Sequence, residues 1–370
     1  MPHRFSSTIE HLFHHPLCKE SPCMNHPEVK PRPEWIPIVK KYSVPDNRKS
    51  VSQIITSVLP YIALWILAYQ AYKISFWLAL PVSMLNAGFL MRTFIIQHDC
   101  GHNSFFKSTK LNNFVGSILG VITLTPYFHW RKAHAIHHAT AGDLDFRGIG
   151  DIDTITVEEY MTMDWWGKFK YRFYRHPFIV FVVGPVFVFV FAHRVPMKAK
   201  KGDKKEKASV WWTNAALAVL FVGLSLWIGP KAVFAIQAPI TVFSSMIGVY
   251  LFYVQHQFED TYWRRHKEWD YARAALEGSS FFKLPKVLQW FSGNIGFHHV
   301  HHLSPLIPNY NLERAHYENE IFQTAQTITL STSFRNVFLH LWDEQRKRLI
   351  SFGEYYRYYR SRRARTQTPA

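Results

Sequence analysis

Three short histidine-rich segments hold the residues of this chain that are best suited to chemistry. They are His98-Asp-Cys-Gly-His102, His134-Ala-Ile-His137-His138 and His298-His-Val-His301-His302. Residues at positions i, i+3 and i+4 share one face of a helix, so each segment could direct its imidazoles toward one point. Imidazole is a good ligand for iron, zinc, copper and nickel. Because eight converging histidines exceed what one metal ion needs, we predict two metal ions.

A ninth ligand is predicted outside the three segments. His256 follows a long apolar stretch, as His98 does, and should lie at the same level of the fold. His299 breaks the i, i+3, i+4 spacing and is interpreted as a neighbour of the site. The predicted metal ligands are therefore His98, His102, His134, His137, His138, His256, His298, His301 and His302.

The ligand types favour iron that works with O2. Structural zinc prefers thiolates and is saturated by four ligands, and only Cys100 lies near the segments. Carboxylate di-iron bundles carry Glu-x-x-His motifs, and none accompanies the apolar stretches. A carboxylate could accept the outer ring N–H of a ligating histidine and orient it. The candidates for such neighbouring positions are Asp99, Asp143 and Asp145, with His129 and Asn294 as further candidates.

Apolar stretches beside these segments are long enough to cross a bilayer. A spanning helix needs about 20 mostly apolar residues. Four stretches qualify: Ile54–Tyr72, Ser75–Gln97, Val210–Ile228 and Ala232–Gln255. The connections within each pair are very short, so the sequence predicts two transmembrane hairpins. Two shorter stretches, Phe114–Tyr127 and Phe178–Ala192, are interpreted as re-entrant, interfacial or buried segments that do not span.

The distribution of basic residues predicts the orientation. Lysine and arginine concentrate before residue 54, in residues 194–207 and near the C-terminus, and such clusters favour the cytoplasm. Four spans then place both termini and all three histidine segments on the cytoplasmic side. The formal net charge of +17 is attributed to contact with anionic lipid headgroups and not to nucleic acid.

The sequence divides into three parts. Residues 1–49 form a polar N-terminal segment, residues 50–352 the membrane domain and residues 353–370 a basic tail. Leu330–Phe352 is predicted to be an amphipathic helix. A zinc site is conceivable in the N-terminal segment, but the spacing matches no standard finger, so we interpret the cluster as part of a polar tail. The residues of that cluster are His14, His15, Cys18, Cys23 and His26.

These motifs resemble those of the membrane fatty-acid desaturases over residues 75–352. The first segment with its Asn103-Ser-Phe continuation is similar to the first histidine box of acyl-lipid desaturases that act at the Δ12 or ω3 position. Trp130-Arg-Lys-Ala-His134 resembles the approach to the second box, and Gly293-Asn-Ile-Gly-Phe-His298 with Ile307-Pro-Asn-Tyr310 resembles the third. Tyr253-Val-Gln-His256 matches an isolated histidine of the family. Gly142–Asp151 resembles a stretch of bacterial members.

The resemblance implies an all-α integral membrane fold with four spanning helices and a cytosolic helical cap, and two iron ions held mainly by histidine. It also implies O2-dependent insertion of a cis double bond, Δ12/ω6-like, into an acyl-lipid or acyl-thioester in the bacterial inner membrane. No His-Pro-Gly-Gly haem motif is present, so electrons are expected from a separate ferredoxin, or cytochrome b5, with its reductase. Chain length and the carrier of the acyl group stay open.

Three other activities are alternatives to desaturation. An alkane or carotenoid hydroxylase or ketolase would share the metal site, but Gln255-His256-Gln257-Phe258 differs from the alkane hydroxylase motif. A zinc-dependent membrane hydrolase would need fewer histidines. A metal transporter should carry histidines within its spans, whereas here they lie at the span ends.

Overall fold

Helices make up most of the chain, and four of them are long and apolar enough to cross a membrane. The computed structural model describes residues 33–360 except for residue 198. The long helices are α3 (Asn47–Ile74), α4 (Phe76–His102), α10 (Lys204–Ile228) and α11 (Pro230–His256). They confirm the four predicted spans. Each one continues into polar residues at the end that was predicted to face the cytoplasm.

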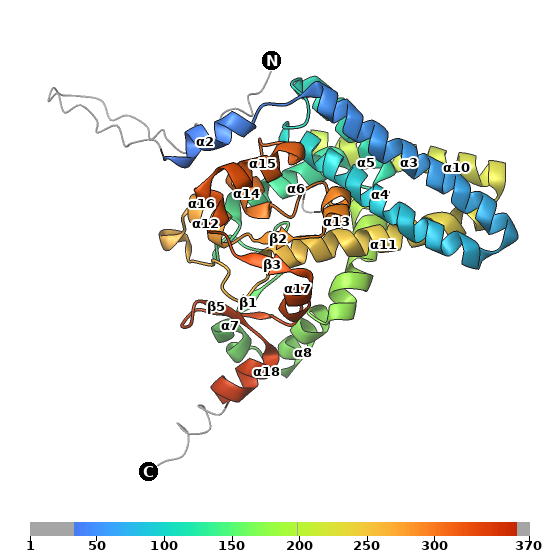
Figure 1. Cartoon of the computed structure of the whole chain (residues 1–370). Helices are drawn as coiled ribbons and strands as arrows, with labels where there is room; N and C mark the ends of the chain where they lie inside the picture. The colour runs from blue at the N-terminus through green and yellow to red at the C-terminus, as the bar shows by residue number, and fades with distance from the viewer. Residues whose placement is uncertain (1–32, 198, 361–370) are drawn as a thin grey trace, which may run out of the picture. The chain divides into compact units, whose positions relative to one another are not determined.

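Two tight connections join the long helices into hairpins (Figure 1). Ser75 ends α3 and also caps α4, because its hydroxyl accepts a hydrogen bond from the Trp77 N–H at 3.2 Å. Gly229 separates α10 from α11 with a φ of 88°, a conformation that glycine adopts without strain. Helix α4 packs against α3, α5 (Thr109–Ile122) and α11, so it is the central helix of the bundle.

Short helices connect the hairpins and follow the last span, and we call residues 141–164 and 257–360, which lie outside the four long helices, the cap. They are α2 (Trp35–Tyr42), α6 (Tyr127–Thr140), α7 (Val157–Thr162), α8 (Trp165–Tyr174), η5 (His266–Glu268), α12 (Tyr271–Glu277), α13 (Lys286–Phe291), α14 (His298–Leu303), α15 (Asn309–Glu318), α16 (Glu320–Gln323), α17 (Leu330–Asn336), α18 (Phe352–Tyr355) and η6 (Tyr356–Arg360). Ordered structure therefore begins before residue 50 and continues beyond residue 352. The described residues from 37 to 360 form one compact unit.

Residues 179–194 form an irregular helix in which π-helical turns flank a glycine-proline pair. The parts are η2 (Ile179–Val183), α9 (Gly184–Val186), η3 (Phe187–Phe191) and the 3₁₀ turn η4 (Ala192–Arg194). Pro185 has no N–H to donate, and its ring cannot fit against the carbonyl of the preceding turn in a regular α-helix. The wider π turns accommodate that interruption.

Within residues 33–360, five short strands supplement the predicted helical fold. Strand β1 (Ile155–Thr156) pairs in parallel with β4 (Leu341–Asp343), which pairs antiparallel with β5 (Arg348–Ile350). Strand β2 (Phe281–Lys283) pairs in parallel with β3 (Thr327–Thr329). These pairings join segments that are far apart in the sequence, and β2 also contacts α14, which carries the third histidine segment.

The prediction of a helix over Leu330–Phe352 is wrong. Helix α17 ends at Asn336, and the β4–β5 hairpin occupies most of the rest. Asp343 Oδ1 accepts hydrogen bonds from the N–H groups of Gln345 and Arg346, both at 3.0 Å, and Lys347 adopts a φ of 54°, which closes the turn. Leu341, Trp342, Leu349 and Ile350 are fully buried. Pairing and burial of the hairpin therefore override the helical pattern.

Candidate metal centre

Four helices bring the nine predicted ligands to one end of the membrane bundle. Helix α4 ends with His98 and His102, one turn apart, and the last residue of α11 is His256. Helix α6 carries the second histidine segment and α14 the third. Asn103, in the left-handed conformation, ends α4 just after His102, because its N–H bonds back to the carbonyl of Cys100 at 3.1 Å. The local spacing thus produces the faces expected from the sequence.

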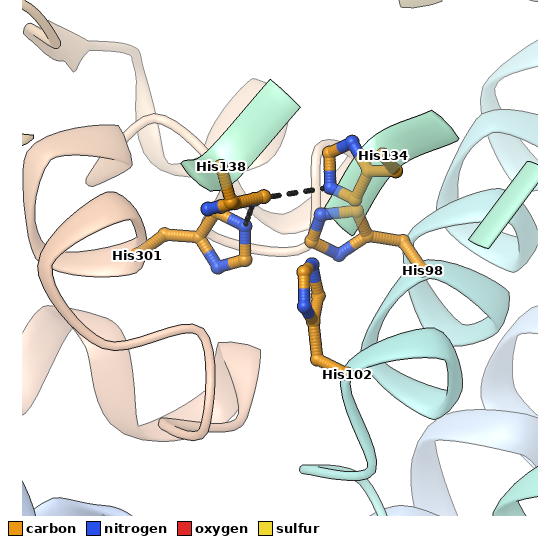
Figure 2. Close-up of side chains that lie close together, drawn as sticks. All are labelled: His98, His102, His134, His138 and His301. Atoms are coloured by element: carbon orange, nitrogen blue, oxygen red, sulfur yellow. Dashed lines mark hydrogen bonds between the residues drawn. The ribbon is translucent and has the colours of Figure 1, made fainter. Parts of the chain in front are cut away.

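The nine histidines divide into two groups, and within each group the ligand atoms lie within 4.8 Å of one another. The five-histidine group consists of His98, His102, His134, His138 and His301, and Figure 2 shows their rings converging from α4, α6 and α14. The four-histidine group consists of His137, His256, His298 and His302. The rings of His138 and His302 stack at 4.2 Å between centroids, so the two groups are direct neighbours.

The ring nitrogens approach each other as they would around a cation. In the five-histidine group, Nε2 of His138 lies 3.1 Å from Nε2 of both His134 and His301. In the four-histidine group, Nε2 of His256 lies 2.9 Å from that of His298 and 3.2 Å from that of His137. His102 Nε2 is buried without a hydrogen-bond partner. A buried ring nitrogen without a partner is costly unless a metal ion satisfies it.

The donor set suits a transition metal such as iron. Among the described residues, both groups contain imidazole only, without thiolate or carboxylate. Cys100 is buried in an apolar cluster with Phe105 and Tyr127 and belongs to neither group. Imidazole favours zinc, copper, iron and nickel over the hard cations that prefer oxygen ligands. The residues therefore fit two adjacent transition-metal ions.

Burial keeps the imidazoles of the site in their ligating form. Desolvation lowers the pKa of five ligand histidines in α6 and α14 well below the usual 6.5, and the neighbouring histidines lower it further. This applies to His134, His138, His298, His301 and His302. Only the neutral imidazole has a free lone pair for a metal.

Asp99 connects the five-histidine group to α15 and, through Asn309, to α3 and the loop before α14. Its Oδ1 lies 3.0 Å from Nδ1 of His98. Its Oδ2 accepts hydrogen bonds from Asn309, from the backbone N–H at 2.7 Å and from the side chain at 2.9 Å. Gln53 of α3 and Asn309 exchange two hydrogen bonds, and Asn294 donates to the Asn309 carbonyl at 3.1 Å. The predicted neighbours Asp99 and Asn294 thus belong to one buried network.

Asp151 has the same relation to the four-histidine group, although it was not among the predicted neighbours. Its Oδ1 bonds Nδ1 of His137, and its Oδ2 is buried without a partner. Nδ1 of His256 lies 3.2 Å from the Gly278 carbonyl oxygen, which orients a second ligand of that group. The sequence of Gly142–Asp151 resembles bacterial family members, but a loop has no periodic spacing, so the sequence does not identify Asp151 as the partner of His137.

The remaining predicted neighbours have other surroundings. Asp143 lies 2.7 Å from the His266 ring, and Asp145 forms an ion pair with Arg265 at 2.9 Å. Burial lowers the pKa of His129, whose charged neighbours include Glu206 and Asp203 of the α10 region. Among the described residues, none of these three side chains forms a hydrogen bond with a ligand histidine. His299 is a neighbour, as interpreted, and bonds His316 at 3.0 Å. The N-terminal His14–His26 cluster lies outside the described residues.

Aromatic side chains support the ligands and pack the surrounding core. The Trp130 ring stacks on that of His134, with centroids 4.6 Å apart. Phe105, Phe106 and Tyr127 are buried together in one apolar cluster. A pocket opens beside the four-histidine group, where Phe252 and Ile152 line it together with His137 and His256. Open space therefore reaches the group with fewer protein ligands.

Comparisons with known proteins agree with this site. A family model described as fatty acid desaturase matches residues 75–331. A Bacillus subtilis protein named fatty acid desaturase is 46% identical over 85% of this chain and 89% of its own length. A Synechocystis sn-1 acyl-lipid omega-3 desaturase (ferredoxin) is 31% identical over 67% of this chain and 69% of its own length.

A plant relative matches less of its own length. The chloroplastic sn-2 acyl-lipid omega-3 desaturase (ferredoxin) of Arabidopsis thaliana is 30% identical over 72% of this chain and 60% of its own length. The matched residues 75–331 include all three histidine segments and His256.

Proposed function

Because the chain belongs to the fatty acid desaturase family, we propose that it inserts a cis double bond into the acyl chain of a membrane lipid by means of two histidine-bound iron ions. Membership is carried by the family match over residues 75–331 and the 46% identity to the Bacillus desaturase. The observation that supports the metal assignment is the division of nine histidines into two adjacent, carboxylate-free groups. We assign the five-histidine and four-histidine groups to one iron each.

The chemistry requires more than side chains can supply. Removal of hydrogen from an unactivated methylene needs a strong oxidant, and two iron ions with O2 would supply it. The overall change takes two hydrogens from the acyl chain and, from the donor and solvent, two electrons and two protons, and it converts O2 to two waters. A separate donor must therefore deliver the electrons. The ferredoxin in the names of the Synechocystis and Arabidopsis relatives supports a small electron-transfer protein.

The protein's own residues bind, orient and exclude water. Asp99 and Asp151 hold His98 and His137 in fixed orientations through their Nδ1 atoms. Trp130 and the buried aromatic cluster around Phe105 keep water from one side of the centre. The pocket lined by Phe252 gives small molecules access to the four-histidine group. Placing one methylene pair beside such a fixed centre is what sets the position of the double bond.

We also propose that the centre faces the cytoplasm of a bacterial inner membrane. The basic start of α10 lies at the same end of the bundle as the histidines: Asp203, just before α10, forms an ion pair with Lys132 of α6, and Lys205 lies 4.0 Å from the Phe128 ring. Clustered lysines at span ends favour the cytoplasmic side. Reporter fusions after Ile74 and after Arg360 should then report opposite sides of the membrane.

Expression in a bacterial host that makes only saturated and monounsaturated lipids tests the function. New double bonds in extracted phospholipids, absent with an iron-free His301→Ala variant, would support acyl-lipid desaturation. Their position, expected to be Δ12/ω6-like, is read from the same extract. Hydroxylated chains without new double bonds would show a hydroxylase instead. Unchanged phospholipids, together with desaturation of acyl thioesters by the same protein, would exclude the lipid as the substrate.

A further inference from the structure

Helix α8 and the irregular helix after it carry a large exposed apolar surface that contributes no ligand to the metal centre. On α8 the exposed residues are aromatic: Trp165 is 75% exposed, Phe169 49% and Phe173 57%. The surface continues along Phe178, Val183, Phe187 and Phe191, with exposures of 44% to 60%. Exposed apolar patches of this extent mark contact with a membrane or another protein.

The two faces of α8 show which way this surface points. Lys168 donates to the carbonyls of Met161 and Met163, and Arg172 donates to the Tyr160 hydroxyl, so the polar face is fixed to the cap. Another side of α8 carries a stack of rings in which Trp166 and Phe169 are 5.2 Å apart and nearly parallel. Helix α8 therefore buries Tyr171 against Tyr160 in the protein and leaves a second, aromatic side exposed.

Arginines hold both ends of the irregular helix at the level of the metal centre. Arg175 precedes it, is fully buried, and donates to Tyr253 and Gln257 at the end of α11. Arg194 ends it and donates to the Leu124 carbonyl, in the connection just before α6, and to Asn214 of α10 at 3.1 Å. Both ends of the segment therefore lie at the same end of the bundle, which favours a segment that does not cross the membrane completely.

Contacts with α11 place this segment beside the membrane spans. Phe181 packs against Tyr250 and Tyr253 of α11, at 5.5 and 5.1 Å between ring centroids. In Figure 1 the segment after α8 runs across the direction of α11 and not along it. The axes of α8 and of residues 179–194 differ by 54°. Its exposed side is thus continuous with the lipid-facing surface of the spans.

We propose that residues 165–191 form a monotopic docking surface that lies in the boundary between headgroups and acyl chains of the membrane leaflet next to the metal centre. Tryptophan and phenylalanine are favoured at that depth, and the Lys170 amine, 5.2 Å from the Trp166 ring, can reach the anionic headgroups. The exposed rings enter the lipid while the arginine-anchored face holds the cap against the bilayer. Two other arrangements compete with this proposal. A second copy of the chain could cover the surface, or the segment could form a fifth span.

Spin labels in the full-length protein, reconstituted into phosphatidylethanolamine and phosphatidylglycerol vesicles, test the proposal. Cys18 and Cys23 are replaced by serine, and the buried Cys100 is retained. Single cysteines then replace Phe169 and Phe187. Val219→Cys on α10, at a position that is 75% exposed on a span, is the lipid reference, and Arg273→Cys on α12 of the cap is the aqueous reference. Variants are compared only if they elute as the parent does and retain its metal content.

Both test labels should collide with O2 far more than with a water-soluble nickel chelate, relative to the cap reference, at a depth of about 5–10 Å below the headgroups. Cap-like accessibility at both sites would overturn the proposal. So would shielding from both reagents with spin–spin broadening that grows with protein density, which indicates a second copy. A label at position 187 as deep as the bilayer centre would indicate a fifth span.

Discussion

Asn309 donates from its backbone N–H, at 2.7 Å, and from its side-chain amide, at 2.9 Å, to the same oxygen of Asp99. The other Asp99 oxygen lies 3.0 Å from Nδ1 of His98. The first residues of α15 therefore fix a carboxylate that orients a ligand on α4. Because Asp99 is buried, loss of either donor leaves its charge poorly compensated.

Asn309→Ala should weaken metal binding by about 10- to 100-fold, as changes to residues behind metal ligands generally do. Iron content measured during titration with a chelator gives the affinity. Asn311→Ala is the control, since Asn311 bonds the Tyr42 carbonyl and not Asp99. Equal iron retention in both variants would show that Asn309 is only structural.

One ligand change in each group should separate the two metal positions. His301→Ala removes a member of the five-histidine group, and His137→Ala removes a member of the four-histidine group. Each variant should lose all desaturation while it still inserts into the membrane, because the two ions act on one substrate. His129→Ala, outside both groups, should keep the parental iron content. Full turnover by either ligand variant would refute the shared centre.

The sequence predicts the ligands well because helix geometry is local. In α6 the i, i+4 pair His134 and His138 joins the five-histidine group, while His137, displaced around the helix axis, joins the other. That division depends on how α6 sits between α4, α11 and α14, and no spacing within one segment specifies it. The four spans follow from composition alone.

Contacts between segments that are far apart in the sequence cannot be predicted from the spacing of residues within one segment. The partner of Asp99 is 210 residues away, and Asp151 reaches His137 through a loop without periodicity. The acids nearest the second segment in sequence, Asp143 and Asp145, bond His266 and Arg265 instead. The β4–β5 hairpin is not predicted for the same reason, because the burial of Trp342 depends on residues elsewhere in the chain.

Asp151→Asn should selectively weaken the four-histidine group. The amide removes the negative charge that favours a hydrogen bond from Nδ1 of His137, so Nε2 becomes a poorer ligand. We expect partial loss of iron and a larger fall in turnover than in substrate affinity. Asp153→Asn is the matched control, because Asp153 is exposed and lies two residues further along the same loop. Parental iron content and turnover in Asp151→Asn would contradict the role.

The stability of the cap should fall in mild acid, in part through His340. Burial, and secondarily the charge of Arg175, lowers the pKa of His340 to about 3, whereas an unfolded histidine has a pKa near 6.5. Below pH 6.5 the unfolded state binds a proton that the folded state does not, so stability is present above that pH and declines as the pH falls toward 3. By pH 5 this one group costs about 2 kcal/mol of the free energy of unfolding. His340→Gln removes the titration, and its melting temperature should therefore drop less than the parent's between pH 7 and pH 5. His176→Gln, at an exposed position, should follow the parent, and an identical pH dependence of all three proteins would contradict the assignment.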